Sequence, residues 1–292
     1  MRYWYYPGCS LHSTGREYDL SARAVAQALG IELIELEDWN CCGASSVHGL
    51  YSHEAALALP ARNVMLAQAK ALDIAIPCAD CFYHSAAADQ RLRNDDTFRT
   101  EIETTLALTY HGGARPRTLL DVFGTDVPTE TLAARVKRPL EGLRPASYYG
   151  CLLVRPPDLA GRWDDPEHPT VMDSILRALG STPVRWSYSV ECCGASLSIG
   201  RSDIVSRLVG RIVAGAVEAG ANCIVTACPM CQANLDGRQD TSNVPLPVFY
   251  FTELMGLALG CDGTDRWLKR HLTDPRPVLT CLESGSMDKR IA

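Results

Sequence analysis

The residues of this chain best suited to chemistry are cysteines, which occur in two sets with the same pattern. The pentapeptide Cys-Cys-Gly-Ala-Ser begins at Cys41 and again at Cys192, 151 residues later. A Cys-x-x-Cys follows each copy and one lone cysteine precedes it, so ten of the thirteen cysteines belong to the pattern. The first set is Cys9, Cys41, Cys42, Cys78 and Cys81, and the second set is Cys151, Cys192, Cys193, Cys228 and Cys231. We expect the function to lie in what these two sets hold.

Five thiols in each set favour a metal cluster over a single metal ion. A structural zinc site closes with four ligands. Adjacent cysteines chelate one small tetrahedral ion poorly, whereas they can reach different irons of a larger cluster. Sets of soft thiolate ligands select iron–sulfur clusters, and the spacing differs from that of ferredoxin cubanes. The prediction is an iron–sulfur site in each half, with a zinc-stabilised scaffold as an alternative.

The composition as a whole excludes several classes of protein. A net charge of −6 and the lack of a basic run argue against nucleic acid as a partner. No stretch approaches the roughly 20 apolar residues of a membrane span. We therefore expect a cytoplasmic protein, where thiols stay reduced and a cysteine-rich chain more often binds metal than forms disulfides.

Repeated local patterns should position both sets. Short apolar runs predict strands at residues 2–6, 32–36, 73–76, 146–149, 182–188 and 223–226. Amphipathic or alanine-rich runs predict helices at residues 18–29, 54–72, 170–179 and 203–219, with a helical stretch from 82 to 108. Each cysteine motif then falls in a loop after a strand.

These elements predict an α/β fold with two halves related by a pseudo-twofold axis. The sheets should be parallel, with the cysteine loops at the carboxyl ends of the strands, where such folds place their sites. We expect a first cysteine-rich domain over residues 1–143, a second over 144–260 and a C-terminal tail over 261–292. The path of the tail cannot be predicted.

The paired motif resembles the cysteine-rich CCG domain of the heterodisulfide reductase B subunit. The resemblance covers residues 2 to about 260 and includes Tyr-Pro-Gly-Cys-Ser-Leu-His, Asp-Trp-Asn-Cys-Cys-Gly-Ala-Ser and Cys-Pro-Met-Cys-Gln-Ala-Asn-Leu-Asp. It implies one noncubane [4Fe-4S] cluster in each half, bound by the ten cysteines of the two sets. A bacterial type, such as the sulfur-oxidising heterodisulfide-reductase-like complex, fits the resemblance.

The same resemblance implies a disulfide or thiol oxidoreductase component that works in a complex. Two facing clusters would each pass one electron to a disulfide, or would run the reaction backwards on thiols or sulfane sulfur. The chain has no Gly-x-Gly-x-x-Gly motif, so its partners would be the ferredoxin-like C subunit and the flavin-containing A subunit of such a complex. The alternative is a non-catalytic electron-transfer subunit of a flavin dehydrogenase complex. The physiological thiol and the direction of electron flow stay open.

Other reactive side chains have simpler interpretations. Cys223, Cys261 and Cys281 lie outside the pattern and are interpreted as ordinary thiols. The histidines that flank the cysteine loops could donate protons, but exposed or capping roles are the simpler expectation; they are His12, His48, His53 and His84. The acids Asp38, Asp80 and Glu191 are expected to cap helices or to set the loops.

Overall fold

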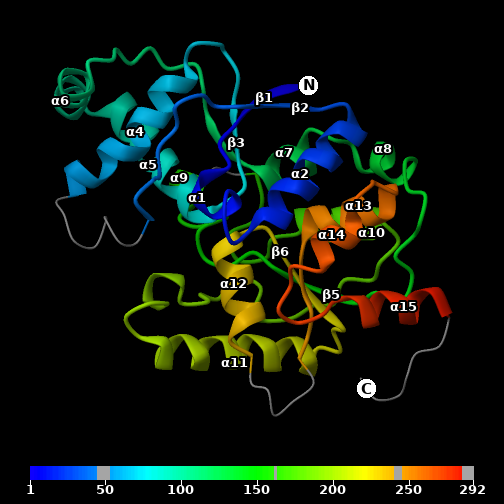
Figure 1. Cartoon of the computed structure of the whole chain (residues 1–292). Helices are drawn as coiled ribbons and strands as arrows, with labels where there is room; N and C mark the ends of the chain where they lie inside the picture. Colours follow the sequence, from blue (N-terminus) through cyan, green and yellow to red (C-terminus); the bar gives the residue numbers. More distant parts are fainter. Residues whose placement is uncertain (45–52, 161–162, 240–244, 285–292) are drawn as a thin grey trace.

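Two parallel sheets, one in each half of the chain, carry the cysteine loops (Figure 1). The computed structural model describes residues 1–44, 53–160, 163–239 and 245–284. The first sheet has the strand order β2-β1-β3-β4, and the second has the order β5-β6-β7. The strands are β1 (Arg2–Tyr5), β2 (Glu32–Glu35), β3 (Ile74–Ile76), β4 (Pro116–Thr118), β5 (Pro145–Tyr148), β6 (Cys223–Thr226) and β7 (Val248–Tyr250). The predicted α/β class with parallel sheets is confirmed.

Helices follow nearly every strand. In the first half they are α1 (Gly8–Leu11), α2 (Arg16–Leu29), α4 (His53–Ala67), α5 (Ala79–Asn94), α6 (Asp96–Leu106), α7 (Leu119–Thr125) and α8 (Thr129–Ala133). From residue 144 onward they are α9 (Pro157–Ala160), α10 (Val171–Ala178), the 3-10 turn η1 (Ala195–Leu197), α11 (Ser202–Glu218), α12 (Pro229–Gly237), α13 (Phe251–Leu259), α14 (Thr264–Leu268) and α15 (Arg276–Ser284). Up to residue 284, where the description ends, the predicted tail therefore contains two short helices.

Helix α2 illustrates how the sequence determines an element. Its buried side chains recur at helical spacing, from Tyr18 through Ala22 and Val25 to Leu29. The helix ends at Gly30, whose φ of 73° lies in the left-handed region that glycine tolerates best. The predicted boundaries of 18–29 are close to the observed ones.

Helix α4 ends five residues before the predicted residue 72. The Trp4 indole donates a hydrogen bond to the Ala67 carbonyl at 2.6 Å, which occupies an acceptor that another turn would use. The predicted helical stretch 82–108 is split into α5 and α6. Asp95, between them, has an extended backbone and accepts a hydrogen bond from Phe98 N at 2.9 Å, so it begins a new helix.

The predicted strand at residues 182–188 is wrong. This segment runs beside β5, and Thr182 N and Val184 N donate to the carbonyls of Leu143 and Pro145 at 2.9 and 3.0 Å. Pro145 cannot return a hydrogen bond because proline has no backbone N–H, and Pro183 has none either. The segment occupies the place that β2 occupies beside β1, but it does not form a complete ladder.

The two halves exchange helix contacts. Helix α2 of the first half packs against α13 of the second, and α10 of the second half packs against α7 of the first. These helices lie together on one side of Figure 1. A single buried cluster of apolar side chains extends through both halves, and a smaller one lies among α4, α5 and α6. The sequence repeat therefore does not correspond to two independent cores.

Candidate functional site

The thiols of the first set converge from α1, from the loop after β2 and from the start of α5. The Sγ atoms of Cys9 and Cys41 are 3.7 Å apart, and those of Cys42 and Cys81 are 3.3 Å apart. Cys9 and Cys41 are exposed, whereas Cys42, Cys78 and Cys81 are buried. The set therefore has an inner group of thiols and an outer pair near solvent.

The second set repeats this arrangement at the equivalent positions. Cys193 Sγ lies 3.6 Å from Cys231 Sγ, matching Cys42 and Cys81. The Cys151 thiol lowers the pKa of Cys192, as the Cys42 and Cys9 thiols do for Cys41. Cys192 is exposed, whereas Cys193, Cys228 and Cys231 are buried. The fold thus arranges the predicted site cysteines as two sets that share one contact, between the second cysteine of each adjacent pair and the last cysteine of each Cys-x-x-Cys.

The two sets meet at Cys78 and Cys228: the Cys228 thiol raises the pKa of Cys78, and the Cys231 and Cys78 thiols lower the pKa of Cys228. Each of these cysteines immediately precedes a helix, α5 or α12. The Ala79 backbone N–H at the start of α5 also lowers the pKa of the Cys228 thiol across the halves. Helix N-termini favour negative charge, and the first turns of both helices lower the pKa of Cys228, whereas the Cys228 and Cys81 thiols and burial raise the pKa of Cys78.

The first cysteine of each adjacent pair, Cys41 or Cys192, also has a lowered pKa. The Cys151 thiol and, next, the Gly194 N–H lower the pKa of Cys192 to about 6 against burial, and the Gly194 nitrogen lies 3.3 Å from the sulfur. The Cys42 and Cys9 thiols lower the pKa of Cys41 in the same way. Because the thiolate is the form that binds metal, the first cysteine of each adjacent pair is prepared as a ligand.

Two tyrosines form hydrogen bonds to the loops that carry the adjacent cysteines. The sequence analysis did not identify these tyrosines as a pair. Tyr6 Oη donates to the backbone oxygen of Asn40 at 2.9 Å, and Tyr148 Oη donates to that of Glu191 at 2.6 Å. Each acceptor residue directly precedes a cysteine pair. Burial and the nearest thiols of its own set raise the pKa of each tyrosine. The signal was available in the repeat, because both tyrosines stand three positions before a lone cysteine.

Two glycines leave room for the sulfurs. Gly8 and Gly150 each precede a lone cysteine and have φ values of 71° and 67°. A Cβ on Gly8 would lie 3.1 Å from Cys81 Sγ, and a Cβ on Gly150 would lie 3.2 Å from Cys231 Sγ. The backbone therefore approaches the sulfur closely at equivalent points of both sets. Five soft sulfur donors in such a cradle fit an iron–sulfur cluster.

No group of three or more Cys, His, Asp or Glu side chains suited to a single metal ion occurs among the residues that the structure describes. The remaining cysteines lie apart from the two sets: Cys223 is fully buried in β6, and Cys261 is half-buried. The side chain of Cys281 lies outside the described residues.

The flanking histidines that the structure describes contact acidic and aromatic side chains. His12 pairs with Glu35 at 3.2 Å and contacts the Trp39 ring. His84 contacts the Tyr83 ring. His48 and the side chain of His53 lie outside the described residues.

The acids beside the loops behave differently from one another. Asp38 sets the loop, as expected, by an ion pair with Arg62. Glu191 contributes its backbone oxygen to the Tyr148 contact. Asp80 caps no helix: it is only 8% exposed and faces thiols, and burial, followed by Cys228, Cys81 and Cys192, raises its pKa to about 7.

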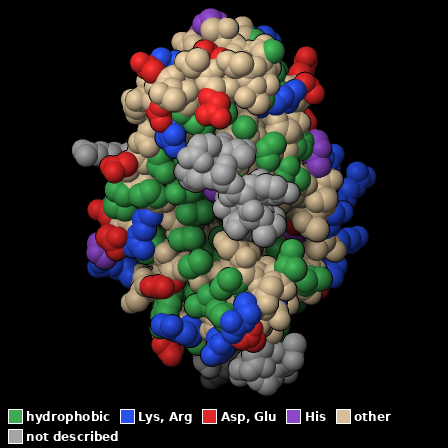
Figure 2. Space-filling view, turned by 90° about the vertical axis from the view of Figure 1, so that its left-hand side faces the viewer, with side chains coloured by type: hydrophobic (Ala, Val, Ile, Leu, Met, Phe, Trp, Pro, Cys, Tyr) green, Lys and Arg blue, Asp and Glu red, His purple; other side chains and the backbone are tan. Residues whose placement is uncertain are grey.

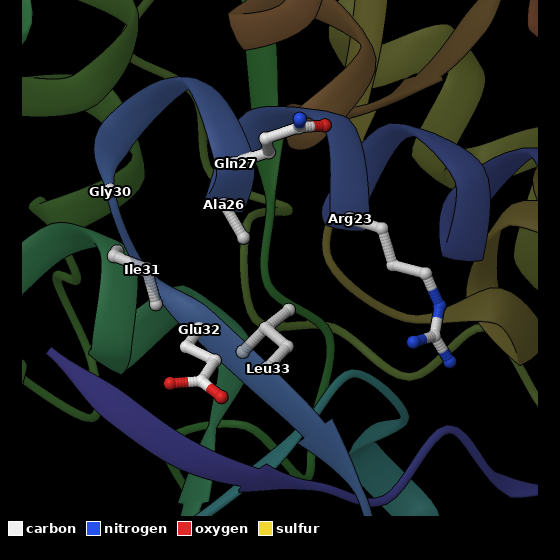
Figure 3. Close-up of a pocket in the computed structure, with 7 residues that line it drawn as sticks. All are labelled: Arg23, Ala26, Gln27, Gly30, Ile31, Glu32 and Leu33. Atoms are coloured by element: carbon white, nitrogen blue, oxygen red, sulfur yellow. The ribbon is translucent and has the colours of Figure 1, made fainter.

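The surface carries a pocket and an apolar area. An open pocket of about 390 Å³ between α2 and β2 is lined by Arg23, Gln27 and Leu33 among others, and includes none of the set cysteines (Figure 3). Figure 2 shows the side on which α4 lies in Figure 1, with a band of hydrophobic side chains and many charged groups toward the margins. Within the described ranges, we find no helix of the length and apolarity needed to span a membrane.

Comparison with known proteins places these features in a family. The model of the cysteine-rich CCG domain matches residues 3–84 and again 146–236. The 8-methylmenaquinol:fumarate reductase membrane anchor subunit of Wolinella succinogenes is 32% identical over 92% of this chain and 96% of its own length. A protein of Archaeoglobus profundus that is named as similar to the heterodisulfide reductase B subunit is 28% identical over 90% and 92%.

A methanogen protein and a solved structure extend the comparison. The B subunit of the ferredoxin/F(420)H(2)-dependent CoB-CoM heterodisulfide reductase of Methanosarcina acetivorans is 27% identical, over 87% of each chain. A crystal structure of a hypothetical protein from Helicobacter pylori superposes with a TM-score of 0.73 at 13% identity. That match covers 94% of this chain and 52% of the other, so it shows the fold alone.

The fold and site define a protein with two cysteine-rich CCG domains. The chain belongs to the family of the heterodisulfide reductase B subunit. The paired domains and these relatives support an iron–sulfur electron-transfer subunit, hence an oxidoreductase component, of a heterodisulfide-reductase-like system.

Proposed function

We propose that the chain binds two noncubane [4Fe-4S] clusters, one in each five-thiol set, and that these act on a disulfide or its thiols. The observation that supports the proposal is the matched geometry of the sets, in which Cys42 contacts Cys81 and Cys193 contacts Cys231 at equivalent positions of the two halves. The proposed ligands are Cys9, Cys41, Cys42, Cys78 and Cys81 for one cluster and Cys151, Cys192, Cys193, Cys228 and Cys231 for the other. We retain the division into residues 1–143, 144–260 and 261–292 as part of the proposal.

The contact between the sets suits a two-electron reaction. When bound, two clusters supply two one-electron steps, which together balance the cleavage or formation of one disulfide. The residues of the chain position the cysteine loops and stabilise negative charge. Tyr6 and Tyr148 hold the cysteine loops, and the first turns of α5 and α12 stabilise negative charge where Cys78 meets Cys228. The same arrangement could handle sulfane sulfur.

Electrons must be exchanged with other proteins of a complex. We propose a ferredoxin-like C subunit and a flavin-containing A subunit as partners, because the chain lacks a nucleotide-binding glycine motif of its own. The relative from Methanosarcina mazei is named as the B subunit of a ferredoxin:CoB-CoM heterodisulfide reductase, which supports such a complex. The apolar band in Figure 2 is a surface that a partner protein could cover. A sulfur-oxidising bacterial complex, acting in the cytoplasm, is part of this proposal.

A second candidate is an electron-transfer subunit that does no disulfide chemistry. The 32% identical relative favours it, because its name places it in a quinol:fumarate reductase as the membrane anchor. In that case the chain would pass electrons between a flavin-bearing dehydrogenase and another carrier, at a membrane surface.

Metal analysis and spectroscopy separate the candidates. Iron and acid-labile sulfide should be measured on anaerobically purified protein, followed by electron paramagnetic resonance before and after a thiol is added to the oxidised form. The main proposal requires about eight irons per chain and a signal that depends on thiol. Full iron with a signal indifferent to thiols would favour the second candidate. Zinc without iron would refute both.

A further inference from the structure

Exposed apolar side chains gather after the second cysteine pair. Within the described ranges six large apolar side chains are exposed, and three of them adjoin the end of α12: Leu197, Ile199 and Leu272. Ile199 is 95% exposed although its turn is ordered, because Leu197 N donates to the Gly194 oxygen and Arg201 N to the Leu197 oxygen, both at 2.8 Å. Exposed apolar side chains that cluster, unlike single ones, are typical of a surface that contacts another molecule.

The end of α12 joins these side chains into one surface. Helices α11 and α12 pack together in the lower part of the molecule, and η1 contacts both (Figure 1). Arg238 donates to the backbone oxygen of Ser198, between Leu197 and Ile199, at 2.8 Å. A Cβ on the neighbouring Gly237 would lie 3.2 Å from Cδ1 of Leu272, which is 79% exposed. The exposed apolar groups therefore surround one guanidinium group.

This surface is positively charged in an acidic chain. Residues 192–217 include three arginines and a single acid, Asp203, whereas the whole chain has a net charge of −6. Arg201 and Arg207 share that acid, with their Nη2 atoms 2.9 and 3.5 Å from Asp203 Oδ2. One carboxylate thus serves two guanidinium groups, which leaves an excess of positive charge. We call this region the Ile199 surface, and it consists of Leu197, Ile199, Arg201, Arg207, Arg238 and Leu272.

A single side chain connects the Ile199 surface with the second thiol set. Ser198 Oγ donates to Asn234 Oδ1 at 3.0 Å. Asn234 Nδ2 in turn donates to the backbone oxygen of Cys193 at 3.3 Å and lies 3.6 Å from Cys193 Sγ. Only one residue therefore separates this surface from a proposed cluster ligand. Because electron transfer slows steeply with distance, a carrier bound here would be well placed to exchange electrons with the second set.

The first half has different residues at the equivalent positions of its sequence. Leu197, Ile199, Asn234 and Arg238 correspond to Ser46, His48, His84 and Ala88. Ala88 is fully buried, so no cationic group stands at that point of α5. The combination of apolar and basic side chains beside a thiol set is therefore a property of the second half.

We propose, on the basis of the two-cluster function above, that the Ile199 surface docks a small acidic electron-carrier protein. Charge complementarity favours an acidic partner and speeds its encounter with the surface, and the apolar side chains provide the contact that excludes water. The path through Asn234 to Cys193 favours an electron carrier among acidic proteins. Each encounter moves one electron from the reduced carrier to the second set, and no covalent bond forms or breaks.

Two carriers of opposite charge test the surface by binding. The probes are an acidic 2[4Fe-4S] ferredoxin and a basic cytochrome c, each titrated anaerobically by calorimetry into the cluster-loaded chain. We expect the ferredoxin to bind at least about tenfold more tightly at about 50 mM salt, and to weaken at least about fivefold at about 300 mM, because salt screens the attraction. Equal affinity for the two carriers, or ferredoxin binding that ignores salt, would overturn the inference.

Variants locate the contact. Ile199→Ser and Arg207→Glu should each raise the ferredoxin dissociation constant at least about tenfold, because a few central side chains carry most of the binding in an interface. Arg115→Glu is the matched control, since Arg115 is 73% exposed and 3.6 Å from Asp73, while Arg207 is 74% exposed and 3.5 Å from Asp203. It changes the net charge equally and should bind the ferredoxin like the wild type. Wild-type affinity in either surface variant would contradict the proposal.

A flotation assay separates a protein partner from a lipid surface. The probe is vesicles of phosphatidylglycerol and phosphatidylcholine, which present negative charge without an electron carrier. We expect the chain not to float with them. Flotation that Ile199→Ser abolishes, together with no ferredoxin binding, would assign the surface to a membrane and overturn the inference.

The rate of cluster reduction gives a second readout. Ile199→Ser should slow reduction by reduced ferredoxin at least about tenfold while reduction by dithionite stays at the wild-type rate, since dithionite needs no docking surface. Equal slowing with both reductants would show damage to the second set and refute the docking role. Ferredoxin binding with a spectrum indifferent to thiols would refute the disulfide chemistry of the proposed function and support the docking surface. A thiol-dependent spectrum without ferredoxin binding would refute the docking surface alone.

Discussion

Tyr18 Oη in the first half donates a hydrogen bond to the backbone oxygen of Ala227 in the second half at 3.1 Å. Ala227 directly precedes Cys228, and the Tyr18 ring stacks on Tyr250 with centroids 4.2 Å apart and planes 11° apart. Both rings are fully buried. A side chain of the first half therefore fixes the loop that carries a thiol of the second set.

Replacement of Tyr18 by Phe tests this coupling. The ring stays in place, so the free energy of unfolding should fall only by about 1 kcal/mol, for one buried hydrogen bond. The second set should nevertheless lose iron to a chelator faster than the first. Tyr83→Phe, at a half-buried tyrosine away from this contact, is the control. Wild-type rates of iron release in Tyr18→Phe would contradict the coupling.

Serine replacement of one inner thiol should remove one cluster only. In Cys42→Ser or Cys193→Ser we expect the iron content to fall from about eight to about four per chain. The thiol contact with Cys81 or Cys231 is lost in each case, while the other set keeps its contacts. Iron and sulfide analysis checks the result. Unchanged iron in either variant would refute the ligand assignment.

Cys223→Ala is the matched control for those variants. Cys223 is fully buried in β6, and burial alone raises its pKa, with no thiol of either set as a cause. Removing the sulfur from a packed strand should lower the free energy of unfolding by about 1 kcal/mol. The absorption spectrum of the clusters should stay the same. A bleached spectrum would show that a ligand has been misassigned.

Gly8→Ala separates backbone strain from contact with the cluster site. Gly8 and Gly30 have φ values of 71° and 73°, so alanine at either position should cost about 1 kcal/mol of stability. Only the Gly8 methyl group would meet a sulfur, that of Cys81, whereas nothing lies within 4 Å of a Cβ on Gly30. Both variants should melt earlier, but only Gly8→Ala should lose iron. Equal iron content in the Gly8 and Gly30 variants would argue against a close approach of the Gly8 backbone to the cluster site.

The buried pair of His271 and Glu253 predicts a pH dependence of stability. The His271 side chain has no exposed area, and its Nε2 lies 2.9 Å from Glu253 Oε1. Burial acts to lower the pKa of His271, but Glu253, Asp236 and Glu17 together raise it. Arg270 also lies close, paired with Glu17. Because the folded state holds the imidazolium more tightly than the unfolded chain does, this stabilisation is complete below the ordinary value of 6.5 and is lost as the pH rises through the folded pKa.

Thermal unfolding between pH 6 and pH 9 checks that prediction. His271→Gln should be less stable than wild type by about 3 kcal/mol at the acidic end, because Glu253 loses its charged partner. The difference should shrink as the pH rises. His168→Gln, at an exposed histidine, is the control and should leave the profile unchanged. A difference that does not vary with pH would contradict the role of the pair.

Much of the fold could be predicted because local rules operate without interference. The strand at 223–226 matches β6, and α2 and α11 lie within two residues of the predicted ends, because their apolar spacing and terminal glycines are local signals. Where the predicted helices and strands were wrong, the cause was a long-range contact. The indole of Trp4 ends α4 early, and Pro145, beside the predicted strand at 182–188, withholds a donor that a ladder would need.

The sequence by itself determined the two five-thiol sets and the two-part plan of the fold, because residue type and spacing along the chain set which thiols can act together. The tertiary structure decided how the sets are joined. Packing of α2 against α13 and of α10 against α7 brings Cys78 to Cys228, Tyr18 to Ala227 and Asp80 to the thiols of the opposite half. Such contacts depend on helices that meet only when both sheets are folded, and no spacing within one half encodes them.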